Sequence, residues 1–296
     1  MSYIGAIAEI ARATGHAYVL FPELAALAHD ILKRPHGAWA RAPLMLVLTP
    51  FLAGVVGTLV TGHMAFGLTS VLLVVGCSIL IIRILRSPIA PALSAGLLPL
   101  VLGDASWWYP PSLLVGLGLL AALSQLWRRV VPAPSPVVSI RDIADDVIEQ
   151  APHDYSWVPA FLLFIAAATL LAEWTGLRFL LFPPLVVVAF EMFAHAAVCP
   201  WARRPLVLPV ACTITAAAGV ALVGLLGAGP LAAVCSLAVG IAVLRVVDLH
   251  VPPALAVGLL PLVMAKPDYA FPISVGAATL LLTASFLVWR KLSPRR

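Results

Sequence analysis

Charged residues are scarce in this chain of 296 residues: Asp, Glu, Lys and Arg make up 10% of it, and 62% of the residues are hydrophobic. Soluble domains have about 25% charged and about 45–50% apolar residues, so the mean hydropathy of +1.06 excludes a water-soluble fold. Apolar runs of about 20 residues, enough to cross a hydrocarbon core of about 30 Å, recur from end to end. Segments such as 72–82 are apolar on all sides, unlike barrel strands. The sequence therefore predicts an all-α polytopic membrane protein.

Cysteine is rare, and the motifs of metal and nucleic-acid binding are missing. The four cysteines lie singly in or beside apolar segments, so we expect them to be packing residues. The basic residues are spread over short loops and form no patch for nucleic acid. No segment carries clustered carboxylates for Mg²⁺ or a His pair at metal-ligand spacing. We therefore expect no nucleic-acid partner, no metal, no cofactor and no catalytic residue. The first residues lack a basic stretch, so no cleavable signal peptide is expected.

A tandem duplication organises the chain. Shifted by 161 or 162 positions, the string Trp39-Ala40-Arg41 matches Trp201-Ala202-Arg203. The strongest stretch is PALSAGLLPLV from Pro91 against PALAVGLLPLV from Pro253, which agree at nine of eleven positions. Chance does not produce such a register. We expect a first membrane repeat at 1–129 and a second at 156–296, joined by a linker at 130–155.

Each repeat contains about five apolar segments after an extra leading element, which makes eleven or twelve segments in total. The leading element at 157–174 is long enough to span the membrane. Its counterpart at 1–13 is short and carries two charges, so a span and an interfacial helix both stay open. The other segments are expected at 16–33, 44–61, 64–85, 88–103 and 108–127, and at 179–199, 206–226, 229–247, 250–265 and 270–289.

Basic residues are concentrated in every second loop of both halves. Because Lys and Arg in short loops stay in the cytoplasm, we expect the linker and the C-terminus to be cytoplasmic and the other connections to face outward. The two repeats then enter the membrane in the same sense. They are predicted to be parallel and related by a pseudo-twofold axis along the membrane normal. We expect a place in a bacterial inner membrane, and the sequence is compatible with a homo-oligomer.

The linker is predicted to contain a short amphipathic helix. The stretch VVPAPSPVVS breaks any preceding helix, and Ser139 with Asp142 three residues later is a capping-box start. One face of the following helix is apolar and the other is acidic. A helix that lies on the cytoplasmic surface and one that docks a partner or gates a path both fit this pattern.

The fourth segment of each repeat is unusually short. Its sixteen residues, at 88–103 and 250–265, reach only about 24 Å. Prolines crowd its first turn, where they start helices because those amides have no helical partner. Pro99 and Pro261 are expected to interrupt the middle of the two helices. Short, proline-interrupted segments at matching positions of two halves indicate the binding site of a transporter.

The stretch DLHVPPALAVGLLPLV from Asp248 resembles the signature of the HPP family of integral membrane proteins, named for a His-Pro-Pro motif at the start of a membrane segment. The motif is degenerate here, because Val251 separates His250 from Pro252-Pro253, and the first half has no His at this place. The resemblance extends over roughly 179–289 and reaches the first half through the duplication. It implies a transporter without catalysis, with some relatives linked to nitrite.

Ionisable residues inside membrane segments cost about 2.5–3.5 kcal/mol each, so they are functional candidates. Arg83 and Arg245 occupy equivalent positions before the proline-rich helices, where two guanidiniums beside two helix N-termini suit a small oxyanion. Snorkelling to the headgroups is the alternative. Asp248 and His250 occur only in the second half and form either part of a site or a helix cap. The candidate substrate-binding residues are Arg83, Ser87, Pro91, Ser94, Arg245, Asp248, His250, Pro252 and Pro253.

A second constellation, expected to handle protons, lies on the first long helix of each half. Glu191 has His195 one turn later on the same face, and a carboxylate beside a His can relay protons. Asp30 is the equivalent of Glu191 and lies near two basic residues, which favours an interfacial ion pair. Glu23, deeper in the same segment, has no acidic equivalent.

The function that these features favour is a transporter or channel for a small anion such as nitrite, bound between the two repeats near the short helices. An intramembrane enzyme acting on a lipid or isoprenoid is the alternative, and a scaffold subunit is a third reading. An enzyme of that kind is expected to show clustered carboxylates or a His pair for a metal. The expected partners are therefore a small anion and the lipid bilayer.

Overall fold

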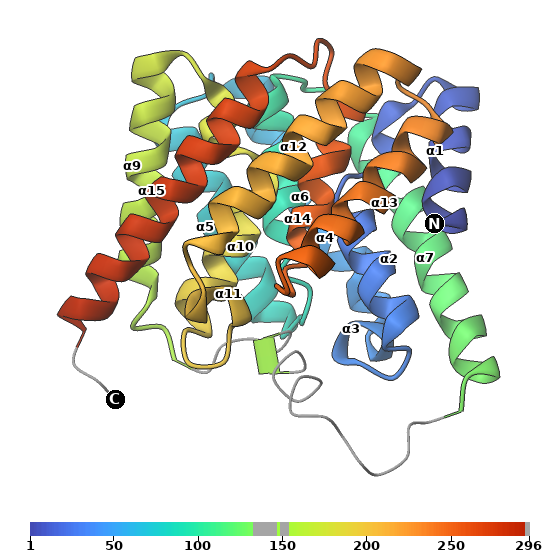
Figure 1. Cartoon of the computed structure of the whole chain (residues 1–296), viewed down its shortest axis with the longest axis horizontal. Coiled ribbons are helices and arrows are strands. Elements are labelled where there is room, and N and C mark those ends of the chain that lie inside the picture. Colours follow the sequence, from blue (N-terminus) through green and yellow to red (C-terminus); the bar gives the residue numbers. More distant parts are fainter. Residues whose placement is uncertain (133–146, 149–153, 294–296) are drawn as a thin grey trace.

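The computed structural model describes residues 1–132, 147–148 and 154–293, and every regular element within them is a helix (Figure 1). Six of these helices are long and apolar enough to cross a membrane, which confirms an all-α chain with the character of an integral membrane protein. They are α4 (Pro43–His63), α5 (Leu68–Leu85), α7 (Tyr109–Val130), α9 (Val158–Thr175), α12 (Val207–Leu226) and α15 (Ala270–Leu292).

The remaining helices are shorter. When the long helices are included, the order is similar in both halves, with α1 leading the first half, α9 leading the second, and η3 added after α14. The first half has α1 (Ser2–Thr14), the 3₁₀ turn η1 (Ala17–Val19), α2 (Leu24–Lys33), α3 (Ala38–Arg41) and α6 (Ala92–Leu102). The second half has η2 (Arg178–Leu181), α10 (Pro183–Ala194), α11 (Pro200–Arg203), α13 (Pro230–Val246), α14 (Pro253–Leu259) and η3 (Leu260–Leu262).

The segments at 16–33 and 179–199, predicted as long helices, are broken instead. The turn η1 ends at Val19, and α2 begins only after Pro22. In the second half, η2 is followed directly by α10, which begins at Pro183. Proline has no amide hydrogen to donate to the preceding turn, so it starts a new helix. With 10 and 12 residues, α2 and α10 are too short to cross a hydrocarbon core.

Prolines also shape the fourth segments. The predicted helix starts are confirmed, because Pro91 is the N-cap residue of α6 and Pro253 is the first residue of α14. The predicted interruption occurs only in the second half, where Pro261 lies in η3 after α14 has ended. In the first half the prediction is wrong, and α6 continues through Pro99.

A tyrosine explains why α6 continues. A proline in a helix leaves the carbonyl four residues before it without its amide partner, and for Pro99 that carbonyl belongs to Ala95. The hydroxyl of Tyr109 in α7 donates to the Ala95 oxygen at 2.7 Å. The equivalent of Tyr109 in the second half is Phe271, which has no hydroxyl. The polar group that satisfies the freed carbonyl is therefore present only where the helix is continuous.

The two halves exchange contacts. α1 packs against α13 of the second half, and α9 packs against α5 of the first. In the interior, α2 packs against α14, and α10 packs against both α6 and α14. These four inner helices are almost wholly buried. The longer helices surround them, and α12, α13 and α15 cross the front of the molecule in Figure 1.

Glycines set the closest helix crossings. A Cβ atom added to Gly57 of α4 would lie 1.9 Å from the backbone oxygen of Gly96 in α6. One added to Gly219 of α12 would lie 2.3 Å from the backbone oxygen of Gly258 in α14. Small residues allow such close approach between helices in membranes. At both equivalent crossings, the helices meet backbone to backbone.

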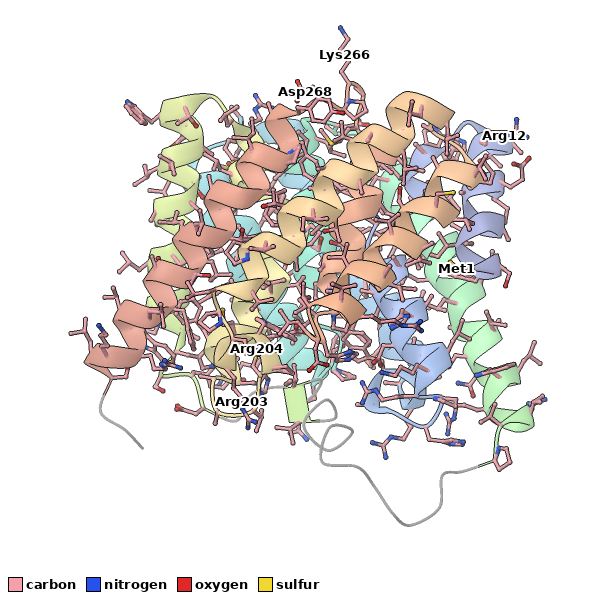
Figure 2. The ribbon with its side chains drawn as sticks, in the orientation of Figure 1. Met1, Arg12, Arg203, Arg204, Lys266 and Asp268 are labelled. Atoms are coloured by element: carbon pink, nitrogen blue, oxygen red, sulfur yellow. The ribbon has the colours of Figure 1, made fainter. Side chains whose placement is uncertain are left out.

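The charged residues labelled in Figure 2 lie at two opposite ends of the molecule. Arg203 and Arg204 lie at the end that also holds α3, α11 and the C-terminus, which we call the basic face. Lys266 and Asp268 lie at the other end, the opposite face. The predicted alternation of loops agrees with these positions. The helix predicted within the linker falls outside the described residues, except for residues 147–148.

Candidate functional site

A small cavity lies where α2, α10 and the start of α14 meet, and we call it the central cavity. Its volume of about 20 Å³ is room for about one water molecule. Five of the residues around it are site candidates from the sequence, and they come from both halves. The lining residues are Asp30, Arg34, Trp39, Ile148, Glu191, Trp201, His250, Pro252 and Pro253.

The first half contributes an ion pair to the central cavity. Nε and Nη2 of Arg34, directly after α2, lie 2.8 to 3.0 Å from the carboxylate oxygens of Asp30. The exposed fraction is 10% for the Arg34 side chain and 2% for that of Asp30. The predicted ion pair of Asp30 is thus confirmed, but it is buried instead of interfacial. Charge-assisted contacts to both oxygens are the strong form of this interaction, so they fix the position of the Asp30 carboxylate against Arg34.

The second half has Glu191 and His195 at the positions of Asp30 and Arg34. Glu191 lies in the last turn of α10, is buried, and lines the central cavity. Because α10 ends at Ala194, His195 follows the helix, and its backbone N–H donates to the Glu191 carbonyl at 3.0 Å. His195 is not one of the described residues around the cavity. A proton relay between Glu191 and His195 stays a prediction.

His250 reaches the central cavity from the segment that leads into α14. His29 of α2 lies within electrostatic range of His250 but does not line the cavity. Asp248 lies elsewhere: it is exposed, its backbone is left-handed with a φ of 47°, and its carboxylate lies 4.0 Å from the guanidinium of Arg204. The structure therefore places His250, but not Asp248, at the cavity.

Two equivalent tryptophans close the sides of the cavity. Nε1 of Trp39 in α3 donates to the Pro88 carbonyl at 2.9 Å, and Nε1 of Trp201 in α11 donates to the Val188 carbonyl at 3.2 Å. Both indoles are buried. The first bond ties α3 to the segment before α6, and the second ties α11 to α10. These bonds fix the large rings that shape the cavity.

The two arginines predicted to flank the site do not line the central cavity. Arg83 and Arg245 are both exposed, at the ends of α5 and α13. The guanidinium of Arg83 lies 4.7 Å from the ring centroid of Tyr155, a cation–π contact. Exposed positions at helix ends agree with the snorkelling alternative. The anion site formed by both arginines remains a prediction that this geometry does not favour.

The polar candidates around the start of α6 are also outside the central cavity. The Ser87 hydroxyl accepts a hydrogen bond from the Thr49 hydroxyl at 2.7 Å and another from the Ile89 amide at 3.2 Å. Pro91 is buried directly before α6, and the Ser94 hydroxyl donates to the carboxylate of Glu23. The proline-rich segment of the second half, and not that of the first, therefore borders the cavity.

A larger cavity of about 330 Å³, the outer cavity, opens at the opposite face. The end of α6, the turn before η2 and the connection from η3 to α15 border it. Arg178, Lys266 and Asp268 are its charged residues. The Arg178 guanidinium also lies 5.7 Å from the ring centroid of Phe66, so it connects the second half with the loop before α5.

The first half fills the corresponding region with aromatic and polar contacts. The Tyr18 hydroxyl donates to the Asp104 carboxylate at 2.5 Å, and the His16 ring stacks on Trp108 with the centroids 4.8 Å apart. At the positions of Tyr18 and Asp104, the second half has Phe179 and Lys266, and both line the outer cavity. The two halves thus differ in how this end is closed.

Sequence reasoning missed Arg34, Trp39, Trp201 and Ile148 as cavity residues. The tryptophans carry a usable signal, because they fall in one of the best-aligned strings of the duplication. Arg34 looks like a residue of a surface loop, and only the fold shows that it turns inward. Ile148 is buried but belongs to the linker, whose position relative to the helices no local pattern indicates.

Comparison of the chain with protein-family models, with curated proteins and with solved structures gives no match. The site therefore rests on the geometry described above.

Proposed function

We propose that this chain is an integral membrane transporter for a small anion, with nitrite as the first candidate, and that the anion binds at the central cavity when the cavity widens beyond its present room for one water molecule. The cavity is the observation that supports this proposal most. Ionisable groups of both halves converge there, at the ends of helices too short to span a membrane. Broken helices are tolerated inside a membrane where they line a cavity, and transporters bind substrates at such places. The resemblance to the HPP family agrees with this function.

The charges around the central cavity favour binding of the anion together with a proton. Arg34 balances Asp30, so Glu191 and His250 decide the net charge of the cavity. An ionised Glu191 repels an anion, whereas a protonated Glu191 beside a protonated His250 attracts it. A pH gradient then drives uptake of the anion.

We further propose that the path runs between α10 and α14, which pack against each other. Phe179, before α10, borders the outer cavity, and Glu191, near the end of the same helix, borders the central cavity. In the segment of α14 and η3, Pro253 at the start borders the central cavity, and Met264 after the end borders the outer cavity. At the outer cavity, two basic residues against one acidic residue attract anions.

For the architecture, we propose two parallel repeats about a pseudo-twofold axis along the membrane normal, with the basic face in the cytoplasm. The common order of helices and the exchanged pairs, α1 with α13 and α9 with α5, support this arrangement. The basic loops support the orientation. Labelling of single cysteines at Asp104, Asp268 and Arg203 tests it: label on Asp104 or Asp268 from the same side as Arg203 contradicts the proposal.

Flux into proteoliposomes tests the transport function. The purified full chain is reconstituted, and uptake of nitrite, nitrate, formate and chloride is measured with and without an imposed pH gradient. We expect saturable, protein-dependent uptake of at least one anion, which is faster when the outside is acidic. Absence of protein-dependent flux for the whole panel contradicts the proposal. Flux that follows the anion gradient alone identifies a channel.

Two variants connect the flux with the cavity. Replacing His250 by Asn removes a protonatable group from the cavity. A hydrogen bond to a charged group contributes about 1.5–3 kcal/mol, so we expect its loss to lower the apparent affinity for the anion by roughly tenfold or more. Arg203→Gln is the matched control, because Arg203 is exposed on the same face and lies outside the cavity. We expect the control to keep the wild-type affinity.

A further inference from the structure

Glu23 is a buried carboxylate that the central cavity does not include. It precedes α2 as its N-cap residue, its exposed fraction is 1%, and its side chain makes no capping hydrogen bond to the helix. One carboxyl oxygen, Oε1, accepts a hydrogen bond from the Ser94 hydroxyl in α6. The other, Oε2, is buried and has no hydrogen-bond partner among the described residues. A group in this state needs a ligand or a proton to satisfy it.

Among the described residues, the neighbours of Glu23 offer no positive charge. α6 and α14 carry no ionisable residue, and the cations of α7 lie at its far end. Tyr109 of α7 interacts electrostatically with Glu23, but its hydroxyl donates to the Ala95 carbonyl. The other titratable groups on the adjacent elements fall into two sets. One set is hydrogen-bonded elsewhere: Tyr18 to Asp104, Arg12 to Glu9, and Tyr3 to the Gly116 carbonyl. The other set is His29, Asp30 and Lys33 on later turns of α2, and Arg41 on α3.

A carboxylate without a cation is expensive in such a place. Transferring an isolated ion from water to an apolar interior costs far more than transferring the neutral acid, so the group binds a proton instead. The positive end of the α2 dipole offsets only part of this cost, about 0.3–1 kcal/mol at an ordinary helix end. A protonated carboxyl also gains an O–H donor.

Glu23 lies on the same face of α2 as the central cavity. Asp30 follows it by seven residues, which is two helix turns and about 10 Å along the axis. Residues seven apart in a helix point in nearly the same direction, so α2 presents one carboxylate at the cavity and one deeper in the protein. Asp30 is already paired with Arg34, whereas Glu23 is not paired with any described cation.

We propose that Glu23, oriented by Ser94, is a proton-binding site of this chain. A role of this proton in uptake rests on the proposed transport function, but the site itself does not. The second half has Pro184 and Ala256 at the positions of Glu23 and Ser94. The site therefore belongs to the first half alone.

Infrared difference spectroscopy of the reconstituted full chain tests the site without any transport assay. Ordinary Glu carboxyls are ionised at neutral pH, so a carbonyl stretching band of a protonated carboxylic acid at pH 7 reports a buried acid. We expect this band in the wild type and in Glu191→Gln, and its loss in Glu23→Gln. We expect the band to move in Ser94→Ala, because the hydrogen bond from Ser94 is removed, and to move in D₂O, because the proton exchanges.

Three results overturn the proposal directly, and a fourth applies if Glu23→Gln does not fold. The first is the absence of the band in the wild type at pH 7 and below, and the second is its persistence in Glu23→Gln. The third is loss of the band when sodium replaces choline at constant pH, which identifies a sodium site instead of a proton site. If Glu23→Gln does not fold, the shifted band in Ser94→Ala decides, and an unchanged band there overturns the proposal. Failure of anion flux with the expected spectra refutes the transport function alone.

Discussion

The inner helices occur in the same order in the two halves, but their polar side chains differ. α6 is continuous through its proline and bonds to Glu23 through Ser94, whereas α14 gives way to a 3₁₀ turn at Pro261 and has Ala256 at the position of Ser94. The glycine crossings are alike in both halves. The polar residues of the first half and their apolar equivalents in the second are Glu23 and Pro184, Ser94 and Ala256, and Tyr109 and Phe271.

This difference separates two kinds of constraint. Two kinds of position that the backbones require are the same in both halves: glycine at the crossings of Gly57 and Gly219, and proline at the starts of α6 and α14. The buried ionisable groups are not: Asp30 with Arg34 forms an ion pair, and Glu191 with His195 occupies the same place. A buried polar group is costly unless it is satisfied or used, so the positions where the halves diverge are the places to look for chemistry.

The largest effect is expected at the glycine crossings. Gly57→Ala and Gly219→Ala each place a methyl group against a backbone oxygen that cannot move away like a side chain. We expect a loss of more than about 3 kcal/mol, above the usual range for overpacking, and a strong drop in the yield of folded protein. The measurement is thermal unfolding in detergent, followed by size-exclusion chromatography.

The controls for this prediction are Gly62→Ala and Gly224→Ala, which are equivalent to each other and lie on α4 and α12. An added Cβ atom has open space at Gly224 and an ordinary contact at Gly62. Both controls should keep or slightly raise the stability, because Ala favours helices by up to about 1 kcal/mol over Gly. Equal effects at Gly57 and Gly62 are incompatible with a backbone contact at this crossing.

An effect of similar size is expected from separating the buried ion pair. Arg34→Gln leaves the Asp30 carboxylate without its cation, and breaking a buried pair in this way costs about 3–5 kcal/mol. The double variant Asp30→Asn, Arg34→Gln leaves no charge behind, so we expect it to be clearly more stable than Arg34→Gln. Thermal unfolding of the three proteins compares them. A double variant that is no more stable than the single one argues against a buried pair.

A smaller effect is expected at the continuous proline helix. Tyr109→Phe removes the donor to the buried Ala95 carbonyl, and an unsatisfied buried group costs about 1–3 kcal/mol. Tyr269, which is exposed, offers the control Tyr269→Phe, with an expected change within about 0.5 kcal/mol. The same unfolding assay applies. Indistinguishable stabilities of the two variants refute the explanation given for Pro99.

The smallest effect is expected at the exposed arginines. Arg83 and Arg245 do not line the central cavity. The double variant Arg83→Gln, Arg245→Gln should therefore leave the anion flux of proteoliposomes within about twofold of the wild type, because solvent screens exposed charges. A loss of flux larger than tenfold restores the anion site predicted from the sequence.

The helical membrane fold, the helix starts at prolines and the ion pair of Asp30 were predictable, since they depend on composition and on neighbours along the chain. The interruption of the segments at 16–33 and 179–199 was not, because the apolar pattern continues across the break. The candidates Glu191 and His250 reach one cavity, but Arg83 and Arg245 do not, since the direction in which a helix end faces depends on packing between the halves. For the same reason, Arg34 was not expected in the interior.

Glu191 provides the most direct test of proton-driven anion transport through the central cavity. In proteoliposomes, uptake driven by a pH gradient is compared with exchange of labelled for unlabelled anion. The comparison is made for the wild type, for Glu191→Gln, and for the double variant Asp30→Asn, Arg34→Gln. We predict that Glu191→Gln abolishes the gradient-driven uptake and retains exchange, which needs no net proton movement. The double variant should retain both gradient-driven uptake and exchange, because the ion pair that it removes is neutral as a whole. Gradient-driven uptake with wild-type pH dependence in Glu191→Gln would contradict this account.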